Sequence, residues 1–433
     1  MSRYIWLVLF MFSTFSTALW AQQEEKEEWS EKLKDFTVDV HLAMQFWTSY
    51  SFDQEVYNEE LQKYRPVDDR LNFQIRRSRM SFKAQAYERL KINMTAALDL
   101  VGRDELAATE GGFNNGGSPR FRIWNAYVQW KLSKQSEHLY VTSGYFLPQI
   151  GRESMTAALR SNSMEKAWSQ NYLRRHMSGS GPGRVTGVNL GGLMVKENRW
   201  INYKYDIGLF SSTFGANTAG IKSSPSILGR MEFFFGDPEQ DKYKLSHKVN
   251  YFGKRHGLSL AIAAAHQGAR DKYLQNNVFS ADFLFNHGPF QMDGEVNLLQ
   301  RKGEITMEDE GTIDISGQNL TGYWRMGYNF TLSNGQVIEP VAMWMFFFGA
   351  LDEKGQQEAL TMGMPTAQEL KWNMGFNWYL NPDLKISLFY TFRQADAGQA
   401  ELPEILNNYF EETATGIPYR KGNWVGLGLV AII

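Results

Sequence analysis

The sequence predicts an all-β protein, a transmembrane antiparallel β-barrel of about sixteen strands. Two observations support this fold. Apolar and polar residues alternate almost without a break from Thr37 to the C-terminus, in segments of about ten residues. Short and long links between these segments also alternate along the chain. In lipid an open sheet edge would leave backbone groups without partners, so we expect the strands to close into a barrel.

The segment FQIRRSRMSFKAQA, residues 73–86, shows the alternation and also its most unusual feature. Met80 and Phe82 share one parity, whereas Arg77, Arg79 and Lys83 share the other, and the two parities of a strand lie on opposite faces. The segment alone is compatible with a basic face in open water or in a confined pore. An arginine facing lipid at mid-depth costs roughly 2–4 kcal/mol, and a sixteen-stranded lumen is wide enough for water. We therefore expect the basic row to face an aqueous pore.

The same period recurs in further segments, which are residues 38–50, 91–100, 122–132, 200–210, 290–299, 370–380 and 423–432. Short links are predicted at 88–90, 133–137, 196–199, 286–288, 333–335 and 381–383, and long links at 51–71, 101–120, 148–183, 211–226, 301–319, 349–367 and 394–422. Barrels of this class have short periplasmic turns and long outer loops. A count of seventeen strands would put the later turns on the wrong side. The count becomes sixteen if residues 236–257 form one long periplasmic connection.

The N-terminus is predicted to be a signal peptide, residues 1–21, followed by a charged periplasmic leader, residues 22–36, and the barrel, residues 37–433. Arg3 precedes an apolar run, and Ala21 precedes the polar Gln22. An uncleaved anchor helix is the alternative. No later apolar run, including residues 341–350, reaches the length of about 18 residues that a spanning helix needs.

The composition limits the possible partners. The chain has no cysteine, which excludes disulfides and thiolate metal sites. It has 45 Lys and Arg against 47 Asp and Glu, a balance that does not indicate a nucleic-acid partner. The expected partners are outer-membrane lipid, lipopolysaccharide and small solutes.

The link at residues 148–183 stands out by its length and its charge. Its acidic residues are Glu153 and Glu165, and its basic residues are Arg152, Arg160, Lys166, Arg174 and Arg175. Loops of this length usually have a function, and rings of Arg or Lys at a constriction select anions. Guanidinium groups suit phosphate and carboxylate because they can donate two parallel hydrogen bonds. We expect this loop to fold into the pore; an external lid facing water or lipopolysaccharide is the alternative.

Three segments resemble the phosphate-selective porins O and P: IRRSRMSFKAQ (75–85), GYFLPQIGRESMTAALRS (144–161) and GPGRVTGVNLGG (181–192). The resemblance implies a trimeric outer-membrane porin, with no cofactor and no catalytic or metal site, that passes anions such as phosphate or polyphosphate. Residues that match its motif positions are Arg76, Arg77, Arg79, Arg152 and Arg184. With the basic residues of strand and loop, the predicted solute-path residues are Arg76, Arg77, Arg79, Lys83, Arg152, Arg160, Lys166, Arg174, Arg175 and Arg184.

The chain departs from this family at positions near the expected anion path. Ala157 and Ala158 stand where family members often have serines, and Leu147 stands where a lysine is common. The C-terminal residue is Ile433 rather than an aromatic residue. Phosphate specificity is therefore a separate question from the porin fold.

Parity also predicts a balanced set of inward charges outside strand 73–86 and the long loop. The basic members are Lys91, Lys131, Lys204, Arg230, Arg325, Lys371, Lys385 and Arg393; the acidic members are Asp39, Asp99, Asp206, Glu232, Asp282, Asp293, Glu295 and Glu369. We expect these charges to cancel, so that selectivity depends on strand 73–86 and the loop.

Other functions have weaker support in the sequence. Ser333-Asn334-Gly335 resembles part of an outer-membrane phospholipase motif, but Thr331 replaces its histidine and Asn-Gly is a favoured hairpin turn. The seven histidines form no spaced metal pair, so an enzyme is not expected. A general or sugar-type diffusion channel remains open as an alternative. So does a barrel subunit of a larger envelope complex that docks through the leader and residues 236–257.

Overall fold

The computed structural model describes residues 37–433 except 112–118, 197–200, 212–223, 308–310 and 402–403. The predicted signal peptide and leader lie outside the described residues. No helix in the described part of the chain combines the length and apolarity needed to cross a membrane.

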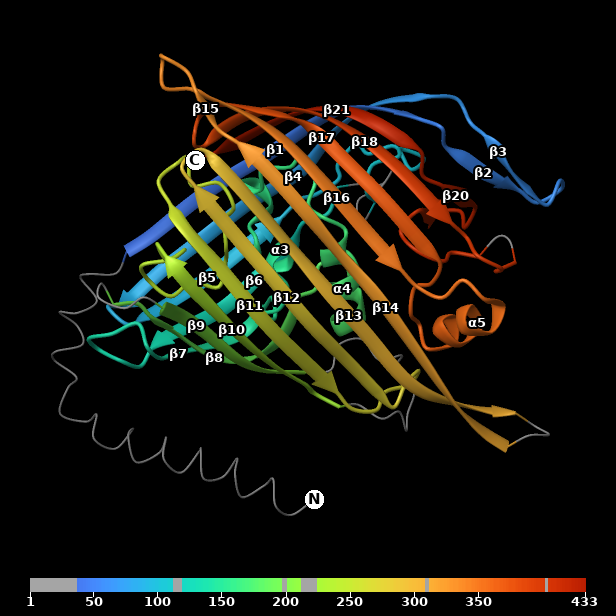
Figure 1. Ribbon diagram of the computed structural model, residues 1–433, viewed down its shortest axis with the longest axis horizontal. Helices are drawn as coiled ribbons and strands as arrows, with labels where there is room; N and C mark the ends of the chain where they lie inside the picture. Colours follow the sequence, from blue (N-terminus) through green and yellow to red (C-terminus); the bar gives the residue numbers. More distant parts are fainter. Residues whose placement is uncertain (1–36, 112–118, 197–200, 212–223, 308–310, 402–403) are drawn as a thin grey trace.

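The main sheet closes on itself because β1 pairs antiparallel with both β4 and β21 (Figure 1). Its strands are β1 (Thr37–Phe52), β4 (Arg70–Tyr87), β5 (Leu90–Ala97), β6 (Arg122–Lys131), β7 (Tyr140–Phe146), β8 (Val185–Met194), β9 (Ile201–Phe210), β10 (Ser226–Gly236), β11 (His256–Gln267), β12 (Gln275–His287), β13 (Phe290–Met307), β14 (Gly311–Tyr328), β15 (Phe330–Thr331), β16 (Val337–Phe348), β17 (Gln368–Asn381), β18 (Leu384–Asp396) and β21 (Asn423–Ile432). The two-residue β15 continues β14 along the same partner, β16. The described strands therefore form a closed sixteen-strand barrel, as predicted.

Burial follows the period of two that predicted the strands. Outward apolar side chains remain exposed, with Ile262 at 64% and Trp324 at 51%. Inward polar neighbours such as Ser259 and Asp282 are buried. An apolar outer band with a polar interior is the arrangement that lipid requires of a spanning barrel.

Additional elements cover the long-loop end of the barrel. Strands β2 (Glu55–Asn58), β3 (Lys63–Pro66), β19 (Phe410–Glu412) and β20 (Pro418–Arg420) form a second sheet, and α5 (Glu353–Thr361) follows β16 in the sequence. Figure 1 shows β2, β3, β20 and α5 at the end of the barrel away from the C-terminus. That end faces outward if the short turns are periplasmic.

The prediction of a loop at residues 301–319 is wrong for most of that range. β13 and β14 stay paired in register out to Met307 and Gly311. Charged residues such as Glu304 and Asp314 interrupt the apolar alternation, which made the segment look like a loop. Outside lipid a paired ribbon needs no apolar outer face, and Met362 packs with Ile315 to cover one side of it.

The lumen is filled by chain segments that enter from both ends. The loop at residues 148–183 contains α3 (Arg152–Met155), η2 (Ala158–Arg160) and α4 (Ser169–Ser178), and Figure 1 shows α3 and α4 inside the barrel. Residues 237–255, between β10 and β11, contain no named strand. They meet the loop where the His247 N–H donates to the Met155 carbonyl at 3.2 Å and the Ala157 N–H donates to the His247 carbonyl at 3.1 Å.

Candidate functional site

A cavity of about 840 Å³ lies between strands β4–β6 and the inward loop. Its charged lining is strongly unequal, with eleven basic residues and four acidic residues among those described. The basic residues are Arg76, Arg77, Arg79, Lys83, Lys91, Arg122, Lys166, Arg174, Arg175, Arg184 and Lys244; the acidic residues are Asp39, Asp99, Glu110 and Glu165. We call this set, with the strands and loop that carry it, the basic wall.

Eight of the ten predicted solute-path residues line this cavity. Arg152 and Arg160 do not line it. Three further cations, Arg122, Lys91 and Lys244, line it without having been predicted as solute-path residues. Parity within segment 91–100 places Lys91 inward, but the register shift between Thr95 and Ala96 reverses the parity of Arg122 relative to Lys131. Lys244 lies in a connection without any period.

A β-bulge explains how two adjacent arginines of β4 both face inward. The register pairs Gln45 with Arg77 and then Phe46 with Ile75, so Arg76 has no partner position on β1. An extra residue in one strand shifts the side-chain alternation by one. Arg76 and Arg77 are consequently both buried, at 8% and 5% exposure. A strict period of two would have placed Arg76 on the lipid face.

Four of the cations are neutralised by two carboxylates. Arg76 Nε donates to Glu165 Oε2 at 2.7 Å, and Arg77 donates to Glu165 Oε1. Arg79 forms a bidentate pair with Asp99, and Arg122 lies 3.9 Å from the same carboxylate. Burial opposes the ionisation of Glu165, but the attraction of its two arginines outweighs burial and lowers its pKa to about 2. Glu165 therefore remains an anion under all ordinary conditions.

Other cations of the basic wall contact only neutral acceptors among the described residues. Lys166 Nζ donates to the Thr156 carbonyl at 2.8 Å, and Arg174 Nε donates to Ser154 Oγ at 2.9 Å. Arg184 Nη1 donates to the Pro182 carbonyl at 2.5 Å. No ion pair with a described residue within 4.0 Å is formed by Lys83, Lys91, Lys166, Arg174, Arg175, Arg184 or Lys244.

Burial and mutual repulsion lower the pKa values of two of these cations, Lys166 and Arg174. Burial is the main cause that holds the pKa of Lys166 well below its usual value, and Arg174 adds to the shift. Burial also lowers the pKa of Arg174 to about 10; Glu153 opposes this shift, whereas Arg77 reinforces it. Cations that repel one another in a partly enclosed space are stabilised when an anion enters it.

Trp124 helps to hold two of the arginines in place. The guanidinium carbon of Arg79 lies 4.1 Å from the centre of the Trp124 ring, and that of Arg184 lies 3.8 Å from it. Such stacking fixes a planar guanidinium without neutralising its charge. Gly183, with φ of 72°, precedes Arg184, and a Cβ there would overlap the Arg174 side chain. The Gly-Pro-Gly-Arg run thus permits the close approach of Arg174 and Arg184.

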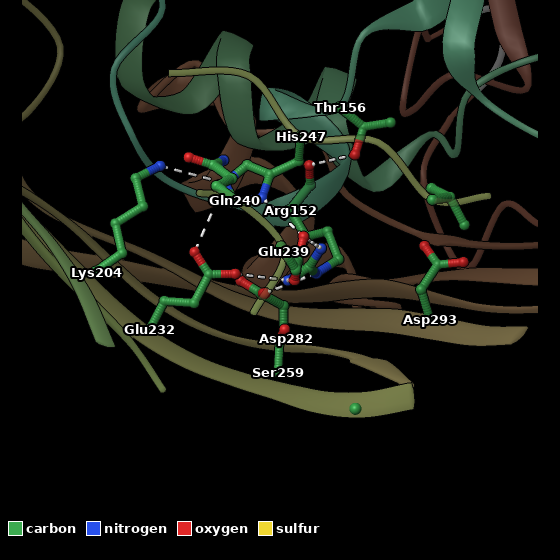
Figure 2. Close-up of polar contacts among 12 residues, drawn as sticks. Arg152, Thr156, Lys204, Glu232, Glu239, Gln240, His247, Ser259, Asp282 and Asp293 are labelled. Atoms are coloured by element: carbon green, nitrogen blue, oxygen red, sulfur yellow. Dashed lines mark hydrogen bonds and ion pairs between the residues drawn. The ribbon is translucent and has the colours of Figure 1, made fainter. Parts of the chain in front are cut away.

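Arg152, one of the two predicted solute-path residues outside the cavity lining, is fully buried among carboxylates. It donates to Glu232 Oε1 at 2.8 Å, to Glu239 Oε1 at 2.7 Å and to Asp282 Oδ1 at 3.1 Å (Figure 2). These carboxylates already neutralise it, so it presents no free charge to a solute. It joins the inward loop to β10, β12 and residues 237–255.

The same cluster contains the one group of potential metal ligands found among the described residues. Glu232, Glu239 and His247 bring ligand atoms within 4.8 Å of one another. Arg152 donates to both glutamates, so a cation already occupies this carboxylate set. Arg160 lies elsewhere, partly exposed, and pairs with Asp383 at 2.6 Å in a short turn.

The opposite side of the lumen is formed by β10–β18 and the loop residues that contact these strands, and we call it the paired wall. Arg325 pairs with Asp293 at 2.6 Å and with Glu153 at 3.0 Å, and Arg230 pairs with Asp282. The Glu153 N–H donates to Glu295 at 2.9 Å, which ties the loop to β13. Charges cancel within the paired wall, and the excess of cations in the basic wall comes mainly from β4 and the inward loop, the two segments that the expected balance left out.

Comparison with known proteins supports the fold and finds a similarity to one porin family. Residues 48–212 match the family described as phosphate-selective porin O and P. A search of curated proteins finds no match. Among solved structures, the anion-selective porin from Comamonas acidovorans superposes with a TM-score of 0.54 at 11% identity, covering 92% of this chain and 100% of that porin.

Two further porin structures superpose over most of the chain. The Salmonella typhi OmpF complex with daunomycin gives a TM-score of 0.51 at 9% identity, covering 92% of this chain and 97% of that chain. Pseudomonas putida OprB gives a TM-score of 0.51 at 9% identity, covering 94% and 96%. At these identities the structures establish the fold alone. The predicted resemblance to the phosphate-selective porins O and P is confirmed over residues 48–212. Together with the fold, this match supports an outer-membrane channel for small solutes in a Gram-negative bacterium.

Proposed function

We propose that this chain is a passive outer-membrane channel that favours small anions. One observation carries the proposal: seven lysines and arginines line the cavity without an ion pair to a described carboxylate. Phosphate and polyphosphate are the solutes that the family resemblance suggests.

In the mechanism that follows from this geometry, basic side chains replace the water molecules that solvate the anion. An anion entering the narrow space loses water, and the guanidinium and ammonium groups of Arg184, Arg174, Lys166 and Lys83 replace those hydrogen bonds. These groups come from the inward loop, from β4 and from Arg184 directly before β8, so an anion in the cavity can exchange one for another. Each contact must be weak enough for the anion to be released.

Neutralisation of the acidic inward residues also favours anions. A carboxylate free in the path would repel an anion and attract a cation. Asp99 and Glu165 are each engaged by two arginines, and Asp282 and Asp293 are engaged by arginines of the paired wall. The net field in the cavity is therefore positive.

The test is the reversal potential of the purified channel in planar bilayers under a potassium chloride gradient. We expect chloride to be preferred in the wild type, and addition of phosphate to reduce the chloride current. The double variant Arg174→Met plus Arg184→Met should shift the reversal potential toward cations. A wild type that prefers potassium would overturn the proposal.

The expected assembly is a homotrimer exported by the signal peptide and surrounded by lipid and lipopolysaccharide. The support is the family resemblance, together with the apolar outer band that includes Ile262 and Trp324. Light scattering of the detergent-solubilised protein should give three times the mass of the chain. A monomeric mass that persists at all detergent concentrations would contradict the trimer without affecting the anion path.

A further inference from the structure

The cavity has an apolar side in addition to its cations. Partly exposed apolar and aromatic side chains line it beside the basic wall. They are Trp124, Tyr127, Leu147, Ala157, Ala158, Leu159 and Leu245. Leu147, Ala157 and Ala158 are among them, three positions at which the sequence differs from the porins that it resembles.

The apolar side is held by specific contacts. Ala157 is fixed by its N–H bond to the His247 carbonyl, and the Arg160 N–H donates to the Ala157 carbonyl at 2.9 Å, which shapes η2. Leu245 lies two residues after Tyr243, which stacks on Tyr140 with ring centres 4.9 Å apart. The loop and residues 237–255 thus present alanine and leucine side chains to the cavity from backbone segments that hydrogen-bond to one another.

An inorganic oxyanion does not use such a surface well. Phosphate accepts hydrogen bonds on every side, and alanine and leucine side chains offer no donor. A dehydrated oxyanion facing them would lose hydrogen bonds without replacement. An apolar group facing them instead gains from leaving water, roughly in proportion to the area buried.

We propose that the preferred solutes are organic anions in which a carboxylate or sulfonate is attached to an apolar body. The anionic head contacts the cations of β4 and α4 and Arg184, and the apolar body lies against residues 157–159 and Leu245. This inference rests on the proposed anion channel and names the class of solute that it selects.

The test compares block of the chloride current by acetate, butanoate, benzoate and phosphate in single-channel recordings of the wild type. Acetate and benzoate share a carboxylate and differ in the apolar body. We expect the half-blocking concentration of benzoate to be about tenfold below that of acetate, with butanoate between them and phosphate weaker than benzoate. Benzamide, which lacks the charge, should block far less than benzoate.

Three results would overturn the inference. Equal block by acetate and benzoate would show that the apolar side does not contact the solute, and tighter block by phosphate would show that an oxyanion is preferred. Either result leaves the anion channel intact, because the reversal potential tests that separately. Benzamide block equal to that of benzoate would also contradict it, since the cations would then play no part.

Matched variants locate the apolar contact. Leu245→Asn should weaken benzoate block several-fold and leave acetate block unchanged, and Ala157→Ser plus Ala158→Ser should act in the same direction. Leu61→Asn and Ala414→Ser, at exposed positions of outer loops, should change neither. Unchanged benzoate block in both cavity variants would contradict the assignment. If Leu245→Asn does not fold, the serine variant and the wild-type series decide the question.

Discussion

The basic wall and the paired wall of the lumen both contain buried arginines, but only the paired wall neutralises nearly all of them. Arg325 and Arg152 of the paired wall each contact two or more carboxylates and have no exposed surface. Arg174 and Arg184 of the basic wall contact carbonyl and hydroxyl oxygens instead. One barrel therefore uses arginine in two ways. In the paired wall it fixes the loop, and in the basic wall it supplies the field in the cavity.

The largest expected effect is on stability, from the paired wall. Arg325→Met leaves Glu153 and Asp293 buried without their cation, and breaking a buried pair in this way typically costs about 3–5 kcal/mol. The midpoint of heat denaturation in detergent, followed by circular dichroism, should fall markedly. Arg184→Met is the matched control of the basic wall and should cost much less. Equal losses in the two variants would remove the distinction between the walls.

The next effect is on selectivity, from the basic wall. Arg174→Met plus Arg184→Met removes two cations that have no carboxylate partner among the described residues, and the ratio of chloride to potassium permeability should fall about threefold to tenfold. Reversal potentials measure this ratio. A stably folded Arg230→Met variant should retain the wild-type ratio, because Arg230 is paired with Asp282. A larger change in Arg230→Met than in the double variant would reverse the comparison.

Glu165 lies in the basic wall but pairs with arginines as the carboxylates of the paired wall do, because it neutralises Arg76 and Arg77. Glu165→Gln should increase anion preference about twofold by removing that counter-charge. The pKa of Glu165 is about 2 in the fold, against an ordinary value near 4.5. The carboxylate therefore stabilises the fold fully above about pH 4.5, and this contribution is lost progressively as the pH falls from about 4.5 through about 2. Between about pH 5 and pH 8 its contribution should be constant. A selectivity change in that interval that Glu165→Gln abolishes would contradict this assignment.

Unlike Glu165, Lys166 should make the anion preference depend on pH. Its pKa lies well below the usual lysine value because of burial and neighbouring Arg174, so it loses its proton before an exposed lysine does as the pH rises. Anion preference should therefore decline on the alkaline side. Lys166→Met should show the lower preference where Lys166 is protonated and a flatter profile, so that the two proteins converge as the pH rises. A wild-type profile identical in shape to that of Lys166→Met would rule out this role.

The smallest effect is expected outside both walls. Lys354 and Glu358 form an exposed pair at 3.8 Å on α5, and such surface pairs contribute about 0.3–0.5 kcal/mol. Lys354→Ala should leave the denaturation midpoint and the reversal potential within error of the wild type. A substantial change in selectivity would mean that charges of the outer loops, rather than those of the cavity, set the field.

Most of the barrel could be predicted from the sequence, because lipid requires apolar and polar side chains to alternate along the spanning strands. Segments such as residues 73–86 and 423–432 could be assigned to strands for that reason, and the alternation of short and long links required an even count of sixteen. The outer hairpin of β13 and β14 escaped prediction because it lies beyond the part of the barrel where lipid constrains the pattern.

The site was predictable only in part, because tertiary contacts decide which arginines remain available. The motif positions identified Arg79 and Arg184 correctly as cavity residues. They could not reveal that Glu232, Glu239 and Asp282, from distant segments, would enclose Arg152. Nor could strict alternation place Arg76 inward, since the bulge opposite Gln45 and Phe46 depends on pairing with β1.

Cysteine modification provides the most direct test of which wall borders the solute path, because the chain contains no native cysteine. Ala158→Cys places a thiol in the cavity, and Ala263→Cys places one in the packed core of the paired wall. We predict that a sulfonate-bearing methanethiosulfonate reagent will reduce the chloride current of Ala158→Cys and leave that of Ala263→Cys unchanged. Modification and block at Ala263→Cys, with Ala158→Cys unaffected, would contradict a solute path along the basic wall.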